Sequence, residues 1–206
     1  MLQPNPNSYN TSFLSAQELE MRLAPKVDPL SMTRILDAYE MARSVHEFQV
    51  RNDGTPYFHH STRVCKILLD ELNIYDADVL VGSLLHDVLE DSDTVTRTVL
   101  EYNFGSYVAY LIETLTKDLS KAKSNPDQVD MEHAERLKLA SADCMAIKLA
   151  ARLDNFRCLQ FNLKRNPLVY VRNTFERYLT MADASNDARL HRLAEEIKKE
   201  ANKFLG

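Results

Sequence analysis

Residues 81–91 read VGSLLHDVLED and divide apolar and ionisable side chains between two faces of one predicted helix. The apolar stripe consists of Leu84, Leu85, Val88 and Leu89. His86 and Glu90 are four residues apart, so a continuous helix stacks them in one column. Asp87 and Asp91 form the adjacent column. One imidazole and three carboxylates this close repel one another unless a cation lies among them. The stretch therefore predicts a metal site, whereas an isolated His-Asp pair would be read as an exposed acidic helix end.

The composition favours an all-α protein. The chain has 206 residues, and its 45% hydrophobic content is enough for a sizeable core. Only four glycines and seven prolines argue against an all-β fold, which needs many turns. Residues 1–14 are polar with two early prolines, so we expect an extended N-terminal segment. We expect residues 15–206 to form a single domain.

The net charge and the cysteines limit which partners and which cellular compartment we expect. The formal net charge of −5 gives no global electrostatic case for a nucleic-acid polymer. Cys65, Cys144 and Cys158 lack metal-type spacing and lie in apolar helical contexts, as reduced core thiols do. The N-terminus has neither the basic start nor the apolar run of a signal peptide, and no apolar stretch has membrane-spanning length. We expect a cytoplasmic protein without a membrane partner; the oligomeric state is left open.

Capping residues divide the chain into helices. A capping box opens at Ser15, and the other predicted caps are Asp28 or Ser31, Ser61 or Thr62, Asp76, and Asp93 or Thr94. The helix after Asp28 or Ser31 is expected to run to about Val50. Residues 118–130 are a predicted polar loop, and Met131–Arg152 is predicted to be mostly helical.

His60 is a candidate ligand at a predicted helix start. It follows the turn signal Asn52–Gly54 and Pro56, which keeps a helix from resuming at once. An exposed ring at a helix start can face a metal, although a single histidine is more often a surface or hydrogen-bonded core residue. Because His59 and His60 are neighbours, we expect at most one of them to point into a given site.

Three stretches together resemble a known family. They read HEFQVRNDGTPYFHH (46–60), LLHDVLED (84–91) and IKLAARLDNFR (147–157). In this order and spacing they resemble the HD-type hydrolase domain of the RelA/SpoT homologues, which degrade the alarmones guanosine tetra- and pentaphosphate. The resemblance covers about residues 33–180, with further matches at Phe104-Gly105 and Leu115–Lys117. It implies the multi-helix HD-domain fold and a small stand-alone hydrolase that converts ppGpp or pppGpp to GDP or GTP plus pyrophosphate.

The resemblance also implies roles for individual residues. His60, His86 and Asp87 would be the metal ligands. Glu90 and Asp91 would position and deprotonate the attacking water, a role typically worth ~100- to 10,000-fold in rate. The implied substrate-binding residues are Arg51, Lys117, Lys148 and Asn155. Imidazole and carboxylate ligands together suit Mn²⁺, which lowers the pKa of bound water, and the cationic side chains would stabilise the phosphate charge.

Position 151 departs from the family pattern. The family carries an aspartate ligand there, in a segment that reads like KLADRL, whereas this chain has Ala151. Alanine cannot coordinate a metal, so we expect weak metal binding and slow turnover. Asp154 lies three residues on and is a possible substitute. The chain is either a natural weak-metal variant or an otherwise competent enzyme in which the aspartate has been replaced; the intact remaining motifs favour the second.

Two further functions stay open. The residues that would read the base are not decisive, so an adenosine alarmone or another phosphorylated nucleotide is an alternative substrate. A catalytically silent alarmone-binding sensor is the other alternative, and Ala151 is the feature that supports it.

Overall fold

The computed structural model describes residues 8–117, 125–162 and 164–206. In these ranges every regular element is a helix, and the only β-type pairing is the isolated bridge between Val50 and Pro56. The all-α prediction is therefore confirmed. Nowhere in the described ranges is a helix both long and apolar enough to span a bilayer.

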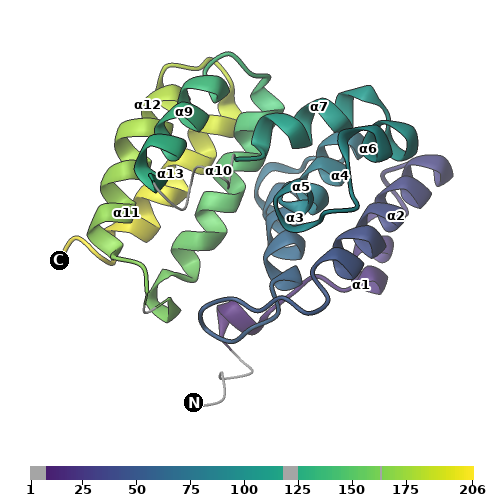
Figure 1. The fold of residues 1–206 in the computed structure, drawn as a ribbon, viewed down its shortest axis with the longest axis horizontal. Coiled ribbons are helices and arrows are strands. Elements are labelled where there is room, and N and C mark those ends of the chain that lie inside the picture. The colour runs from purple at the N-terminus through teal and green to yellow at the C-terminus, as the bar shows by residue number, and fades with distance from the viewer. Residues whose placement is uncertain (1–7, 118–124, 163) are drawn as a thin grey trace.

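Figure 1 shows the order of the helices along the chain. They are α1 (Ala16–Leu23), α2 (Pro29–Val45), α3 (Phe58–Leu72), α4 (Ala77–Leu85), α5 (Val88–Asp91), α6 (Arg97–Phe104), α7 (Ser106–Leu115), α9 (Pro126–Leu137), α10 (Ala142–Arg157), α11 (Pro167–Thr174), α12 (Thr180–Asp183) and α13 (Ala188–Asn202). Short 3₁₀ helices, η1 (Tyr9–Thr11) and η2 (Leu159–Phe161), and a π-helical segment, η3 (Phe175–Leu179), complete the set.

Local capping explains several helix starts. Ser15 accepts the backbone N–H of Glu18, Asp28 accepts two backbone N–H groups at the start of α2, and Asp76 accepts that of Val79. These three predicted caps are confirmed. The cap of α6 is Thr96, so the predicted cap at Asp93 or Thr94 was wrong by two or three residues.

Other predicted boundaries differ because of contacts between neighbouring segments. α2 ends at Val45 instead of about Val50. α3 begins at Phe58, since the N–H of Tyr57 bonds to the carbonyl of Gln49 and the chain turns back early. The predicted caps Ser61 and Thr62 therefore lie buried inside α3.

The predicted polar loop and the helix after it also change. Residues 118–124 lie outside the described ranges, and Asn125 caps α9, which begins at Pro126. The residues from Pro126 onward are therefore helical, where a loop was predicted to residue 130. The predicted helix Met131–Arg152 is two helices, because α9 ends at Leu137 and Ser141 caps α10.

Helix α10 is the central element. Figure 1 shows α1–α7 on one side of it and α9 and α11–α13 on the other. It packs against α3 and α13, and most of its side chains are buried. Gly82 lets α4 come close, since a Cβ there would lie 3.1 Å from side-chain atoms of Ile147 and Leu111. The helices α3, α4 and α10 therefore lie close enough for their side chains to line one site.

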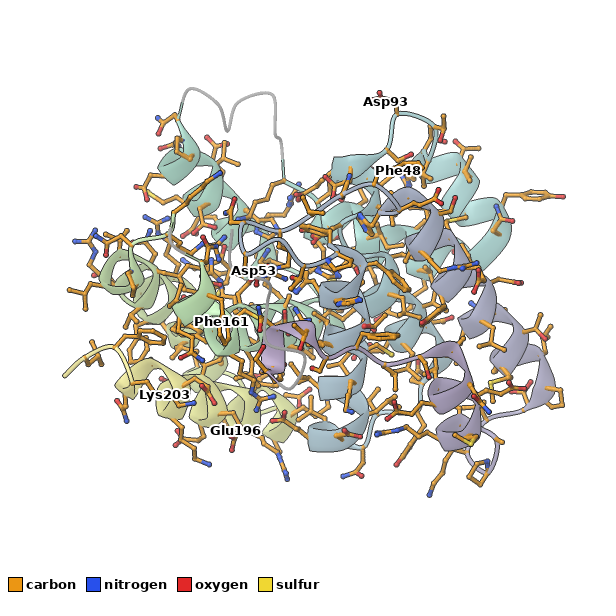
Figure 2. All side chains as sticks on the ribbon, turned by 90° about the horizontal axis from the view of Figure 1, so that it is seen from below. Phe48, Asp53, Asp93, Phe161, Glu196 and Lys203 are labelled. Atoms are coloured by element: carbon orange, nitrogen blue, oxygen red, sulfur yellow. The ribbon has the colours of Figure 1, made fainter. Side chains whose placement is uncertain are left out.

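Helix α13 covers the other side of α10. It buries Leu190, Leu193 and Ile197 and exposes a charged face, as an amphipathic packing helix does. Figure 2 shows Glu196 and Lys203 at the outer edge of the molecule, away from α10. One connected cluster of buried apolar side chains extends from Leu14 to Ala201, so the helices on both sides of α10 share a core.

Candidate active site

The structure brings three predicted ligands together. His60 on α3 meets His86 and Asp87, which follow α4, and one possible ligand atom from each lies within 4.8 Å of the others. The Nε2 atoms of His60 and His86 lie 3.9 Å and 3.3 Å from Asp87 Oδ2. Both imidazoles are buried, and Asp87 is half-buried. This is a set of ligand types that binds divalent transition metals.

A break in the helix carries His86 and Asp87. α4 ends at Leu85 and α5 begins at Val88, so the continuous helix predicted for residues 81–91 was wrong. The ring of His86 turns back and its Nδ1–H donates to the carbonyl of Ser83 at 2.8 Å. Its Nε2 is left to face Asp87. The break falls at His86 and Asp87 themselves, so the four ionisable side chains do not lie on one continuous helix.

The environment of His60 keeps it neutral. Its Nδ1 lies 2.6 Å from Asp154 Oδ2, and because a carboxylate only accepts, Nδ1 carries the proton. Burial lowers the pKa of His60 to about 4, with Arg51 adding to the shift and Asp154 opposing it. A neutral ring with Nδ1 protonated leaves the Nε2 lone pair available to a metal.

Asp154 lies behind His60 and is not placed to ligate an ion beside Asp87. It is fully buried and accepts from Tyr9, His60 and Arg63, with distances of 3.0, 2.6 and 2.6 Å. Burial favours its protonated form, but the hydrogen bond from His60 and the charge of Arg63 outweigh this and lower the pKa of Asp154. The suggestion that Asp154 substitutes for the missing ligand is therefore corrected, because its oxygens are already engaged.

Ala151 lies in the wall of the cleft next to the predicted ligands. Its methyl group is 6% exposed and lines the same cavity as His60 and His86. A methyl group has no lone pair, so position 151 supplies no ligand atom to an ion. The three converging ligands are two imidazoles and a single carboxylate.

The cavity has a volume of about 340 Å³ and a polar, charged lining. All four predicted substrate-binding residues line it: Arg51, Lys117, Lys148 and Asn155. Arg51 Nη2 donates to Asn155 Oδ1 at 2.7 Å, so α10 holds the guanidinium at the cavity wall. Burial lowers the pKa of Lys148 to about 7, and the charges of Lys117 and Arg152 act in the same direction.

The two predicted catalytic carboxylates are placed differently. Glu90 lines the cavity and accepts the backbone N–H of Lys117 at 2.6 Å. Burial and the charge of Asp87 raise the pKa of Glu90. Asp91 does not line the cavity; its Oδ2 lies 3.5 Å from Nδ1 of His46. Glu90 is thus the better placed of the two to accept a proton from a water in the cavity.

Two contacts at this site were missed in the sequence. Tyr57 donates its hydroxyl hydrogen to Asp87 Oδ2 at 2.7 Å, which helps to hold the carboxylate in place. His46 contacts Gln49 Oε1 at 2.8 Å as well as Asp91. Asp87 and Asp91 lie 30 or more residues beyond Tyr57 and His46 in the sequence, so spacing alone does not reveal these two contacts.

A second cavity, of about 430 Å³, continues the first. The two share lining residues: Lys117, Lys148, Ala151, Asn155 and Arg165. The second adds Tyr170, whose ring lies 5.1 Å from the guanidinium of Arg152 and 4.6 Å from that of Arg165. Together the cavities reach the size of small-molecule sites in proteins, and their lining combines the cations with the carboxylates of Asp87, Glu90, Asp127 and Asp130.

Comparison with known proteins agrees with this geometry. The family model for the HD domain matches residues 38–186. This chain belongs to the HD-domain family. Among its relatives, the HD domain is 38% identical over 128 residues to human MESH1, named a guanosine-3′,5′-bis(diphosphate) 3′-pyrophosphohydrolase; the match covers 61% of this chain and 69% of the human protein.

Two more comparisons extend this result. A protein of the same enzyme name from Aquifex aeolicus is 35% identical over 157 residues, which are 75% of this chain and 22% of that protein. A solved structure described as a metazoan ortholog of SpoT that hydrolyses ppGpp superposes with a TM-score of 0.68 at 30% identity, covering 81% of this chain and 94% of the other. The predicted HD-domain fold and the predicted relationship to the RelA/SpoT-type hydrolases are confirmed.

Proposed function

We propose that this HD domain hydrolyses the 3′-pyrophosphate of guanosine alarmones, converting ppGpp or pppGpp to GDP or GTP plus pyrophosphate. The observation that carries the proposal is the convergence of His60, His86 and Asp87 at one end of a cavity lined with cations. The relatives named as 3′-pyrophosphohydrolases support the same substrate class.

The residues fit a divalent ion, and we propose Mn²⁺. Two imidazole nitrogens and a carboxylate suit a borderline-to-hard ion, and the hydrogen bonds of His60 and His86 leave one nitrogen of each ring free. When bound, such an ion lowers the pKa of water and neutralises phosphate charge. His60, His86 and Asp87 would hold it.

The protein's own groups supply the remaining chemistry. Glu90 accepts the proton of the attacking water, and burial and the charge of Asp87 raise its pKa, which makes the carboxylate a stronger base. Asp91 acts beside it in a supporting role, through its contact with His46. Lys117 and Lys148 lie on the cavity wall, where they stabilise the charge of the transferring phosphoryl groups.

Arg51 and Asn155 bind the nucleotide. Their side chains are hydrogen-bonded to each other at the cavity wall, so both are held in place before substrate arrives. The second cavity has room for the diphosphate at the 5′ position, and Arg165, which lines both cavities, is the cation we propose to contact it. Arg152 is already paired with Asp130, so it supports the wall of this cavity.

Ala151 favours a second candidate function, that of a sensor that binds alarmone without turning it over. The cavity lacks one carboxylate, so the ion is bound weakly while the nucleotide-binding residues stay in place. An adenosine alarmone is the alternative substrate, since the side chains that line the cavity recognise phosphates more clearly than a base.

One experiment separates these possibilities. The chain and its Ala151→Asp variant are incubated with Mn²⁺ and a panel of 3′-pyrophosphorylated guanosine and adenosine nucleotides, and released pyrophosphate is measured. Asn202→Asp, which adds the same charge at an exposed position on α13, is the control. Pyrophosphate release by Ala151→Asp alone supports a hydrolase weakened at position 151. Binding without release by every variant supports the sensor, and release of orthophosphate instead would contradict the proposed reaction.

Two further expectations belong to this proposal. We infer that residues 15–206 act as one domain, which the shared core from Leu14 to Ala201 supports. We infer a cytoplasmic location, which the three free, buried cysteines support.

A further inference from the structure

The N-terminal segment of residues 9–12 lies against the rear of the predicted metal site. The hydroxyl of Tyr9 donates to Asp154 Oδ1 at 3.0 Å. The backbone carbonyls of Asn10 and Ser12 each accept from Arg63 Nη1 at 2.9 Å. Figure 1 shows this segment in purple, before α1, although its partners lie on α3 and α10. It therefore joins the ends of two helices that carry site residues.

Arg63 is the centre of these contacts. Its side chain is 1% exposed, and every nitrogen of its guanidinium has a partner. Nε donates to Asp154 Oδ1 at 2.6 Å, and Nη2 reaches Asp154 Oδ2 at 3.2 Å and Cys158 Sγ at 3.5 Å. A buried guanidinium is tolerated only when it is paired and hydrogen-bonded in this way. The position of the Asp154 carboxylate is thus fixed from two sides.

The fixed carboxylate decides how His60 is presented. Asp154 Oδ2 holds the Nδ1–H of His60, so the opposite nitrogen, Nε2, keeps its lone pair and faces Asp87. Without this partner the ring would be free to exchange its proton between the two nitrogens and to turn. A metal would then have to select one orientation, at a cost in affinity.

We propose that Tyr9, Arg63 and Asp154 are positioning residues for His60, so that the metal affinity of the site depends on the N-terminal segment packed behind it. This proposal rests on the proposed role of His60 as a metal ligand. None of the three residues touches substrate or ion; they act through the imidazole.

Asp154→Asn tests the central residue. An asparagine has one acceptor and one donor side, but both sides of Asp154 meet donors, at His60 and at Arg63. One bond is lost whichever way the amide turns. In the Ala151→Asp background we expect Mn²⁺ affinity, measured by calorimetric titration, to fall about 10- to 100-fold. Nucleotide affinity measured without metal should change much less.

Tyr9→Phe tests the segment with a milder change that keeps the charges of Asp154 and Arg63. It removes one hydrogen bond to Asp154, and we expect Mn²⁺ affinity to fall roughly two- to tenfold. Tyr39→Phe is the matched control, since the buried Tyr39 hydroxyl donates to the carbonyl of Leu14 at 3.1 Å and has no contact with Asp154. The control should leave Mn²⁺ affinity within about twofold of its parent.

A second readout needs neither metal nor activity. Nitrogen-15 NMR of the imidazole rings reports which nitrogen of His60 carries the proton. The metal-free chain should show His60 as the single tautomer with Nδ1 protonated, and Asp154→Asn should show a mixture. The control Tyr39→Phe should keep the parent spectrum.

Three results would overturn the proposal. They are unchanged Mn²⁺ affinity in both Asp154→Asn and Tyr9→Phe, an equal loss in Tyr39→Phe and Tyr9→Phe, or a parent His60 protonated at Nε2. If no variant binds Mn²⁺, even with Ala151→Asp, it is the proposed metal site that fails. The tautomer measured in the metal-free chain then decides the role of Asp154 separately.

Discussion

Two residues of α10, three positions apart, differ in what they contribute to the predicted metal site. Ala151 lies on the cleft side, where it offers an ion nothing, and Asp154 lies behind His60, where both oxygens are engaged. The cleft side of the site thus lacks a carboxylate at position 151, whereas the carboxylate of Asp154, behind His60, has hydrogen-bond partners on both oxygens. A carboxylate can ligate an ion only where its lone pairs are free, whereas an engaged carboxylate such as Asp154 can act only through its partner.

The largest expected effect comes from placing a carboxylate at position 151, on the cleft side of the site. Ala151→Asp should raise Mn²⁺ affinity more than roughly 100-fold, since even changes outside the ligand shell cost 10- to 100-fold. Pyrophosphate release from ppGpp should rise with it. Titration with Mn²⁺ and steady-state kinetics measure the two effects. Equal turnover by the chain and the variant at saturating Mn²⁺ would show that position 151 contributes no ligand.

Removing the proton acceptor should be the next largest effect. In the Ala151→Asp background, Glu90→Gln should lower kcat ~100- to 10,000-fold while nucleotide affinity changes little. Asp91→Asn is the matched comparison and should cost less, because Asp91 does not line the cavity. Single-turnover kinetics separates chemistry from binding. A larger loss in Asp91→Asn than in Glu90→Gln would reverse the assignment.

Arg51 contacts both the cavity wall and the buried Asp154, and its replacement should have a smaller effect than the two changes above. It donates to Asn155 at the cavity wall and lies 3.4 Å from Asp154. Arg51→Ala should weaken nucleotide binding about tenfold, the size of one hydrogen bond to a charged group, and weaken Mn²⁺ binding less. Arg43→Ala, on the exposed face of α2, is the control. Equal losses of nucleotide and metal affinity would indicate a structural role for Arg51.

The smallest effect concerns stability at the rear of the site. The pKa of Asp154 is lowered in the folded chain, so its pairing stabilises the fold above the unfolded pKa of ~3.9 and is lost as the pH falls further. Asp154→Asn should therefore be less stable than its parent at pH 7, and the gap should narrow below about pH 4. Urea unfolding at several pH values measures this. A gap that widens on acidification would mean that Asp154 is protonated in the fold.

The sequence predicted what local contacts determine. Ser15, Asp28 and Asp76 cap their helices through bonds to residues two or three positions on, so their spacing is legible in the chain. The convergence of His60 with His86 and Asp87 followed from the family resemblance, because no local pattern links α3 to the end of α4. Most predicted helices are present, and the errors lie mainly at helix boundaries.

The sequence did not reveal what distant contacts determine. At the break between α4 and α5 the His86 ring bonds back to Ser83 and the Asp87 carboxylate accepts from Tyr57, and helical periodicity encodes neither contact. Asp154 looked like a spare ligand because it lies one turn from position 151. Its actual partners, Tyr9 and Arg63, are far from it in the chain, so spacing within α10 could not show that its oxygens are engaged.

The contacts of Arg63 also bear on where the working unit of this protein begins and ends. A polypeptide cut to the family match, residues 38–186, would keep His60, His86 and Asp87. It would lose the two carbonyls that receive Arg63 and the whole of α13, which covers α10. A guanidinium buried without those acceptors is costly, so we expect the excised piece to hold its ligands less firmly than the full chain.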